Sequence, residues 1–163
     1  MITLRARPLT ESAFAPFGTV VTYNPGAPRF GLIRELENYR DTARVHLDFV
    51  TIAARTLPFT TQVMERHPYS SQTFIPIGVA RYLVIVAPPS LPTEPDMTRA
   101  QAFIAESRQC ITYRAGTWHH PATALDRDGF FAMLTWRAGD AGDEEFFSLP
   151  EPMEICAEIG PAS

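Results

Sequence analysis

The sequence predicts an all-β fold, an antiparallel barrel or sandwich with one or two short helices. Segments with alternating or β-branched side chains recur at short intervals along the chain. Long amphipathic helices do not separate them, as they would in a parallel α/β sheet. Proline accounts for 15 of the 163 residues, roughly twice its usual share. Because proline ends helices and strands alike, this composition favours many short elements.

The first elements follow from the pattern near the N-terminus. Ile2–Pro8 alternates and predicts a strand, and Thr10 is the N-cap of a short helix that ends at Gly18. Further strands are expected at Thr19–Tyr23, Ala43–Ala54, Thr60–Glu65, Thr73–Ile77, Ala80–Ala87, Gln109–Arg114, Ala122–Asp126 and Phe130–Arg137.

The segments between these strands predict loops and one helical stretch. Asn24–Arg34 and the proline-rich Pro88–Pro95 are expected to be surface loops. Met97–Ala105 is expected to form one or two helical turns. The acidic run Asp140–Glu145 is most simply a solvated turn.

The charge balance excludes several functions. All 14 basic residues are arginine, against 18 acidic residues, which gives a net charge of −4. An acidic chain is not expected to bind nucleic acid, because phosphate binding needs clustered positive charge. Without lysine, no side chain can form a Schiff base with a carbonyl substrate. The longest apolar run, Tyr82–Ala87, is too short to cross a membrane.

The length and the cysteines predict one domain, residues 1–163, in a reducing compartment. A chain of this length falls within the usual size of a single domain. Cys110 and Cys156 do not have a metal-binding or redox spacing, and Arg5 and Arg7 interrupt the hydrophobic run that a signal peptide needs. A cytoplasmic protein is therefore expected.

The first candidate for chemistry is a polar stretch around His67. Glu65 and His67 are two positions apart, so on a strand both side chains point to the same side. Arg66, between them, is expected to face away. Inside a barrel the shared side is the lumen, where a carboxylate needs a cation or several hydrogen-bond donors.

The second candidate follows Gly116, which permits a tight turn before His119 and His120. Adjacent residues on a strand face opposite ways, so at most one of these histidines can join Glu65 and His67. His119 is the preferred interior residue, and His120 remains an alternative or a histidine at the barrel rim. Two imidazoles and a carboxylate are a typical set of metal ligands. His46, on the face opposite Val45 and Leu47, is expected to be a surface or edge histidine.

Together the two stretches resemble the paired motifs of cupins. The spacing E-x-H-x4-Q-x5-G begins at Glu65, and G-x-x-H ends at His119. Glu65 stands at the position of the first cupin histidine, and Gln72 stands at that of the cupin glutamate. More specifically, the sequence resembles the ureidoglycolate lyase family. The matching segments are Pro8–Gly18, Glu65–Pro68, Gln72–Pro76, Arg99–Ile104 and Gly116–Pro121.

The resemblance implies a cupin-like antiparallel β-barrel, a double-stranded β-helix, that forms a homodimer and acts in allantoin and purine degradation. Members of the family split ureidoglycolate into glyoxylate and urea. It also implies a divalent metal, nickel or another transition metal, and no organic cofactor. The expected partner is therefore the small-molecule substrate, and neither nucleic acid nor a membrane is expected.

The resemblance and the strand alternation together assign candidate roles to seven residues. The candidate catalytic residues are Glu65, His67 and His119. The candidate metal ligands are Glu65, His67, Gln72 and His119. The candidate substrate-binding residues are Gln72, Thr73, Arg114 and His120, with Arg114 as the counter-charge for the substrate carboxylate.

Two other functions remain open at this stage. Three segments depart from the family pattern, at residues 30–34, 38–41 and 136–139. These departures favour a cupin-like metal enzyme that acts on another small hydroxy or keto acid. A non-catalytic module that binds small acids on the same barrel is the other alternative.

Overall fold

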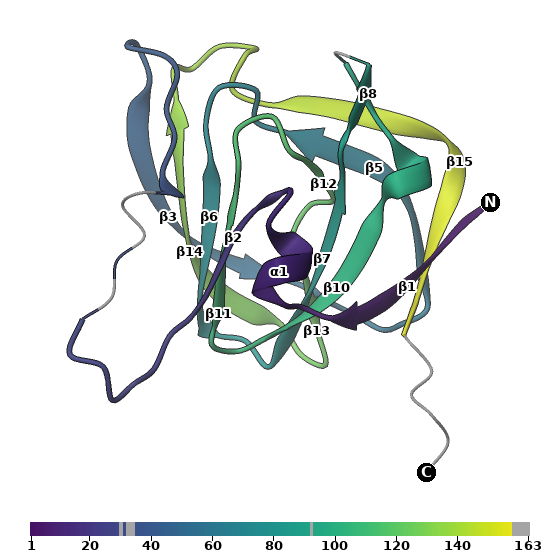
Figure 1. Ribbon diagram of the computed structural model, residues 1–163, viewed down its shortest axis with the longest axis horizontal. Coiled ribbons are helices and arrows are strands. Elements are labelled where there is room, and N and C mark those ends of the chain that lie inside the picture. The colour runs from purple at the N-terminus through teal and green to yellow at the C-terminus, as the bar shows by residue number, and fades with distance from the viewer. Residues whose placement is uncertain (30, 32–34, 92, 158–163) are drawn as a thin grey trace.

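The computed structural model describes residues 1–29, 31, 35–91 and 93–157 (Figure 1). Strands dominate, so the all-β prediction is confirmed. The strands are β1 (Ile2–Pro8), β2 (Gly18–Thr22), β3 (Arg44–Ile52), β4 (Ala54–Arg55), β5 (Phe59–Arg66), β6 (Gln72–Gly78), β7 (Arg81–Ala87), β8 (Pro89–Leu91), β9 (Glu94–Pro95), β10 (Gln101–Glu106), β11 (Gln109–Tyr113), β12 (Trp118–His119), β13 (Thr123–Leu125), β14 (Gly129–Arg137) and β15 (Glu145–Ala157). The helices are α1 (Glu11–Phe14), capped by Thr10 as predicted, and the 3₁₀ turn η2 (Met97–Arg99).

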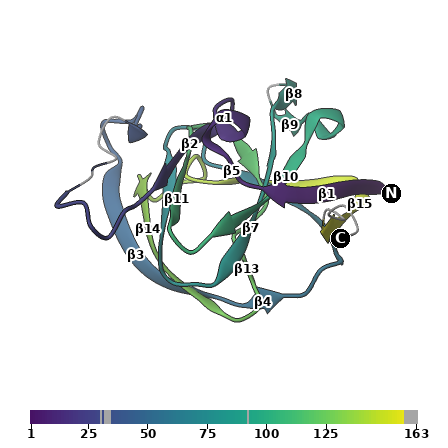
Figure 2. The ribbon, with the colours of Figure 1, turned by 60° about the horizontal axis from the view of Figure 1, so that its bottom comes forward.

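Two large sheets build the fold. One has the strand order β10-β1-β15-β5-β12-β7-β13-β4, and it closes into a barrel because β10 also pairs with β7. The other has the order β2-β11-β6-β14-β3. Figure 2 shows β3 at the outer edge of this second sheet, far from β1 and β15. The pairings of β1 with β10 and β15, and of β13 with β4, are parallel, so the sheets are not wholly antiparallel. These strands are far apart in sequence, and no tight hairpin forces them to run in opposite directions.

The apolar core has two parts. One joins the two sheets and includes the aromatic side chains of Phe14, Phe74, Tyr113 and Phe131. The other is contributed mainly by strands of the closed sheet and includes Met64, Ile85, Trp118, Met153 and Ile155. Within the described residues, no helix is long and apolar enough to cross a membrane.

The helix predicted at Met97–Ala105 is largely wrong, and the last strand, β15, is absent from the prediction. The helix expected at Met97–Ala105 ends at Arg99, and the chain continues as β10. Pairing with β7 on one side and β1 on the other overrides its local helical tendency. β15 was not predicted at all, because Pro150 and Pro152 interrupt its pattern. The register of β15 against β5 shifts between Ser148 and Met153, and such an irregularity accommodates proline.

The predicted loops are only partly correct. Pro88–Pro95 contains the short ladder of β8 and β9. In Asn24–Arg34, and in the departing segment 30–34, residues 30 and 32–34 lie outside the described part of the chain.

The apolar face of β3 points outward. Val45, Leu47 and Phe49 are 57%, 55% and 64% exposed, whereas His46 and Asp48 on the other face are half-buried. His46 therefore lies on the more enclosed side of this strand and is not on an open surface. Alternation gives the two faces of a strand but does not tell which one is covered.

Gly18 permits the close approach of β2 to β11. A Cβ atom at this position would lie 1.9 Å from the carbonyl oxygen of Thr112, which belongs to the backbone and cannot move aside. We expect Gly18→Ala to destabilise the fold by about 3 kcal/mol, because overpacking of this kind forces backbone shifts. In thermal unfolding this corresponds to a loss of roughly 6–12 °C.

Gly31→Ala is the matched control, because a Cβ there meets no atom within 4 Å. Equal melting temperatures for the two variants would contradict this account of the β2–β11 contact.

Candidate metal and catalytic site

Three candidate ligands meet where β5 and β12 pair. His119 lies directly opposite Glu65 in this antiparallel pair, and His67 follows the end of β5. One ligand atom from each of the three side chains lies within 4.8 Å of the others, and all three residues are buried. Gln72, at the start of β6, brings an amide from the second sheet.

The hydrogen bonds of His119 fix its orientation. Its Nδ1–H donates to the carbonyl oxygen of Thr117, at 2.9 Å. Its Nε2 then faces two oxygens, Glu65 Oε1 at 3.2 Å and Gln72 Oε1 at 3.1 Å. The ring stacks on Tyr113 with 4.0 Å between centroids and an interplanar angle of 11°. Because a nitrogen lone pair and two acceptor oxygens repel one another, this geometry requires a proton on Nε2 or a cation between these atoms.

His67 is held in a similar way and leaves one nitrogen free. Its Nδ1–H donates to the carbonyl oxygen of Asp143, at 2.9 Å. Its Nε2 is buried and has no hydrogen-bond partner among the described residues. Burial is the main cause that lowers the pKa of His67 to about 4, and the charge of His119 lowers it further. The imidazole is therefore neutral at pH 7 and offers a lone pair.

Glu65 supplies the negative charge. Burial alone would raise the pKa of its carboxyl group, but the hydrogen bond with His119 and the charges of the nearby histidines lower it on balance. Glu65 is thus ionised at neutral pH although it is only 7% exposed.

This set of donors fits a divalent transition metal. It combines two imidazole nitrogens with a carboxylate, the usual ligands of zinc, nickel and iron. Metal-binding histidines typically donate their second N–H to a carbonyl or carboxylate, as His67 and His119 do. The Nε2 atom of His67 is buried without a hydrogen-bond partner among the described residues, and a metal ion would bind to its lone pair.

The structure brings together four of the seven predicted site residues. Glu65, His67, Gln72 and His119 meet as described above. Thr73 directly follows Gln72, so it faces the other side of β6, where its hydroxyl bonds that of Thr112 at 2.9 Å. Because successive strand residues alternate, Gln72 and Thr73 cannot both reach the cluster.

The other two predicted residues lie elsewhere. Arg114 donates to the carbonyl oxygens of Pro16 and Ala15, at 3.2 and 3.5 Å, beside the end of α1. His120 lines a cavity next to the cluster. Arg66 faces away from the cluster, as alternation predicts, and it pairs with Glu145 and stacks over Trp118.

Asp143 positions His67, although the sequence predicted only a solvated turn at this point. Its carboxylate accepts hydrogen bonds from Arg40 and from the backbone N–H groups of Ala138 and Gly139. Burial opposes ionisation, but these hydrogen bonds lower the pKa of Asp143 to about 2. Its carbonyl oxygen receives the His67 proton. The one sequence signal was an aspartate among glycines, a pattern typical of turns that bond their own backbone.

The fold and the site together define a cupin-like barrel protein with a buried Glu–His–His group able to hold a metal. The family model described as ureidoglycolate lyase matches residues 1–156. The chain belongs to the ureidoglycolate lyase family.

Similar proteins cover nearly the whole chain. A protein of Azotobacter vinelandii named ureidoglycolate lyase is 34% identical and covers 92% of this chain and 95% of its own length. Proteins of the same name from Pseudomonas fluorescens and Burkholderia mallei are also 34% identical. They cover 93% and 94% of this chain, and 95% and 93% of their own lengths.

The anchoring role of Asp143 gives a testable prediction. Asp143→Asn keeps the shape of the side chain but removes the charge that pairs with Arg40, whose side chain is only 14% exposed. We expect a loss of stability of about 2 kcal/mol, because the neutral amide weakens the charge-assisted hydrogen bonds from Arg40, Ala138 and Gly139. Thermal unfolding measures this change, and a metal titration shows whether the site loosens with it.

Asp140→Asn is the control for Asp143→Asn. Asp140 also bonds Arg40, at 2.8 Å, but its side chain is 61% exposed. Exposed ion pairs contribute about 0–1 kcal/mol, so this variant should remain close to wild type. A larger effect from Asp140→Asn than from Asp143→Asn would contradict the assigned role.

Proposed function

We propose that this chain is a ureidoglycolate lyase, which splits ureidoglycolate into glyoxylate and urea. The observation that carries the proposal is the buried contact of Glu65 with His119, next to His67, in a barrel of this family. The names of the relatives support the same activity. By the same resemblance we place the reaction in allantoin degradation.

The reaction needs one proton to move. The central carbon of ureidoglycolate bears a hydroxyl, a carboxylate and a nitrogen of the urea group. When the C–N bond breaks, its electron pair leaves on nitrogen, the hydroxyl oxygen loses its proton and forms the aldehyde carbonyl, and nitrogen gains a proton. Positioned acids and bases typically accelerate such steps by about 10²–10⁴-fold.

Glu65 and His119 can carry this proton. Glu65 is ionised and suits the role of the base that accepts the hydroxyl proton. A proton on His119 Nε2 would lie between this nitrogen and the Glu65 and Gln72 oxygens, and it is the one that we assign to the departing nitrogen. The 3.2 Å contact then returns the proton from Glu65 to His119 and restores the starting state.

A divalent metal would be held by Glu65, His67 and His119, with the Gln72 amide oxygen as a further ligand. In that form His119 Nε2 would bind the ion in place of a proton, and Glu65 would move the proton from the hydroxyl to the departing nitrogen. We propose nickel or another transition metal, and no organic cofactor. Such an ion lowers the pKa of a bound hydroxyl and orients it. Glu65 has two carboxylate oxygens, so one can bind the metal ion while the other accepts the proton of the substrate hydroxyl.

The state of the two cysteines indicates the compartment of the enzyme. Cys110 and Cys156 are both free thiols. Because thiols persist in reducing compartments, we propose that the protein acts in the cytoplasm.

The central prediction compares two histidines. His119→Ala removes the group that faces Glu65, so we expect turnover to fall at least about 10²-fold. Loss of this partner should also lower the melting temperature, so turnover is compared at a temperature at which both variants are folded. His46→Ala should leave turnover nearly unchanged. The measurement is the joint release of urea and glyoxylate from racemic ureidoglycolate at matched metal loading. The site assignment fails if His46→Ala abolishes release while His119→Ala and His67→Ala retain it.

We also propose that two copies of the chain associate through the outer face of the five-stranded sheet. Val45, Leu47 and Phe49 on β3 are exposed there, and Phe130 on β14 stacks with Phe49 at 6.1 Å between ring centroids. β3 is the end strand of its sheet, so its outer edge has no partner strand among the described residues. A second copy would cover both features, since unpaired edges and apolar faces favour association.

Light scattering tests this association. We expect a mass of about twice the 18.2 kDa of one chain. Leu47→Arg should shift the protein towards the monomer, because it places a charge in the apolar face. Leu91→Arg, at a residue that is similarly exposed but lies on β8, should not. A wild-type mass near that of one chain at micromolar concentrations would rule out the dimer.

A further inference from the structure

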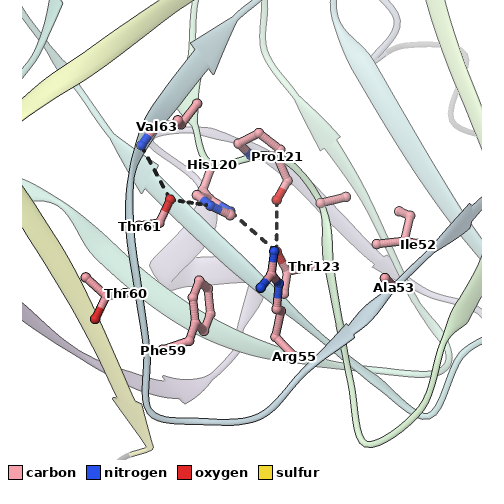
Figure 3. Close-up of a pocket in the computed structure, with 11 residues that line it drawn as sticks. Ile52, Ala53, Arg55, Phe59, Thr60, Thr61, Val63, His120, Pro121 and Thr123 are labelled. Carbon is pink, nitrogen blue, oxygen red and sulfur yellow. Dashed lines mark hydrogen bonds between the residues drawn. The ribbon is translucent and has the colours of Figure 1, made fainter.

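A cavity of about 340 Å³ lies beside the Glu65–His67–His119 cluster. Part of β5, the ends of β3 and β4, and the segment 120–123 line it (Figure 3). Val63 in its wall is two residues before Glu65 on β5, and His120 directly follows His119. Val63 and Glu65 lie on the same side of β5, so the cavity adjoins the cluster along this strand. Its volume is within the range of small-molecule sites.

His120 forms a fixed and neutral part of the wall. The Thr123 hydroxyl donates its proton to the carbonyl oxygen of Pro121 at 3.1 Å. Its own oxygen therefore accepts from His120 Nδ1–H, at 3.4 Å. The Thr61 hydroxyl accepts from the Val63 N–H at 3.4 Å and donates to His120 Nε2 at 3.0 Å (Figure 3). Both nitrogens have partners in the neutral form, so His120 brings no charge to the cavity.

Arg55 brings the positive charge. Its guanidinium extends into the cavity towards Thr123 and His120 (Figure 3). Among the residues that the structure describes, Arg55 has no carboxylate partner. Arg66 and Arg114 are closer to the cluster in sequence, and Arg137 is near enough for its charge to act on His67. All three already have a polar partner. Arg66 pairs with Glu145, Arg137 lies 3.9 Å from Asp48, and Arg114 binds two carbonyl oxygens.

We propose that Arg55 binds the carboxylate of the substrate in this cavity, an inference that rests on the proposed function. Glu65 has to reach the hydroxyl on the carbon that bears the carboxylate, and repulsion between the two carboxylates turns that of the substrate away from Glu65. On that side lies the cavity, where Arg55 at the rim has no carboxylate partner among the described residues. A guanidinium presents two parallel N–H donors that match a carboxylate, and it stays charged at every relevant pH. The neutral His120 and the hydroxyls of Thr61 and Thr123 complete a polar wall without adding charge.

Steady-state kinetics with Arg55→Gln test the proposal. We expect KM for ureidoglycolate to rise about tenfold or more, the usual effect of losing a hydrogen bond to a charged group, while kcat changes little. Arg55 is exposed at the rim of the cavity, so the variant should fold normally. Arg108→Gln is the control, because it removes the same charge from the exposed turn between β10 and β11.

A substrate without the carboxylate provides the second comparison. N-hydroxymethylurea keeps the hydroxyl, the scissile C–N bond and the urea group. If Arg55 binds the carboxylate, wild type and Arg55→Gln should process this compound equally well. A similar KM increase for both compounds would overturn the proposal, because the effect would then not depend on the carboxylate.

Calorimetric titration with glyoxylate separates this proposal from the proposed function. Wild type should bind glyoxylate at least about tenfold more tightly than Arg55→Gln, whether or not ureidoglycolate is cleaved. If wild type does not cleave ureidoglycolate but still binds glyoxylate more tightly than Arg55→Gln, only the proposed lyase activity is wrong. If Arg55→Gln binds glyoxylate more weakly but its KM for ureidoglycolate is unchanged, Arg55 binds the free product and not the substrate. That result would overturn the proposal. The proposal is also wrong if Arg137→Gln raises KM and Arg55→Gln does not.

Discussion

A buried carboxylate constrains the rest of this structure. Glu65 is almost inaccessible to water, and an unpaired ion in such a place costs several kcal/mol. The pairing of β5 with β12 places His119 opposite Glu65, and the turn after β5 brings His67 to the same place. A shift of β12 by one residue would turn His119 away and leave the carboxylate uncompensated. The register of these two strands and the charge of Glu65 therefore depend on each other.

The three neighbouring histidines differ because their hydrogen bonds differ. His67 and His119 each donate Nδ1–H to a carbonyl oxygen, which directs Nε2 to the cluster as a lone pair or a proton carrier. His120 is held between two threonine hydroxyls, so neither of its nitrogens is available. The backbone carbonyls of Thr117 and Asp143 thus decide which imidazoles can take part in chemistry, although neither residue is a candidate ligand.

Strand periodicity predicts that Glu65 and His67 point to the same side of their strand and that only one of His119 and His120 can join them. It does not choose between these two histidines, and the resemblance to cupins is what predicts that the two stretches meet. The same alternation excludes Thr73 from the site, because it directly follows Gln72 on β6. Arg114 could not be placed from sequence, because its long side chain reaches the end of α1, a contact between segments almost 100 residues apart. The role of Asp143 likewise depends on Arg40, which lies far from it in sequence.

The positions of strands are easier to predict from sequence than which face of a strand is covered or which strands pair with it. In β3 the apolar residues alternate as a core strand would, yet they face outward, because the outer side of this edge strand is left uncovered by the described chain. In β15 the prolines interrupt the alternating pattern that would predict a strand. The strand forms because it pairs with β1 on one side and β5 on the other. Both errors arise because local pattern carries no information about which partner covers a segment.

The site also depends on how the two sheets pack. Glu65 and His119 belong to the closed sheet, whereas Gln72 and Tyr113 belong to the five-stranded sheet. The ring of Tyr113 stacks on His119 and also contacts Phe14 and Phe74 of the core. Close-packed interiors transmit small displacements, so a change of volume among these aromatic side chains moves the imidazole relative to Glu65. The apolar core between the sheets therefore sets the distance across which a proton or a metal ion is shared.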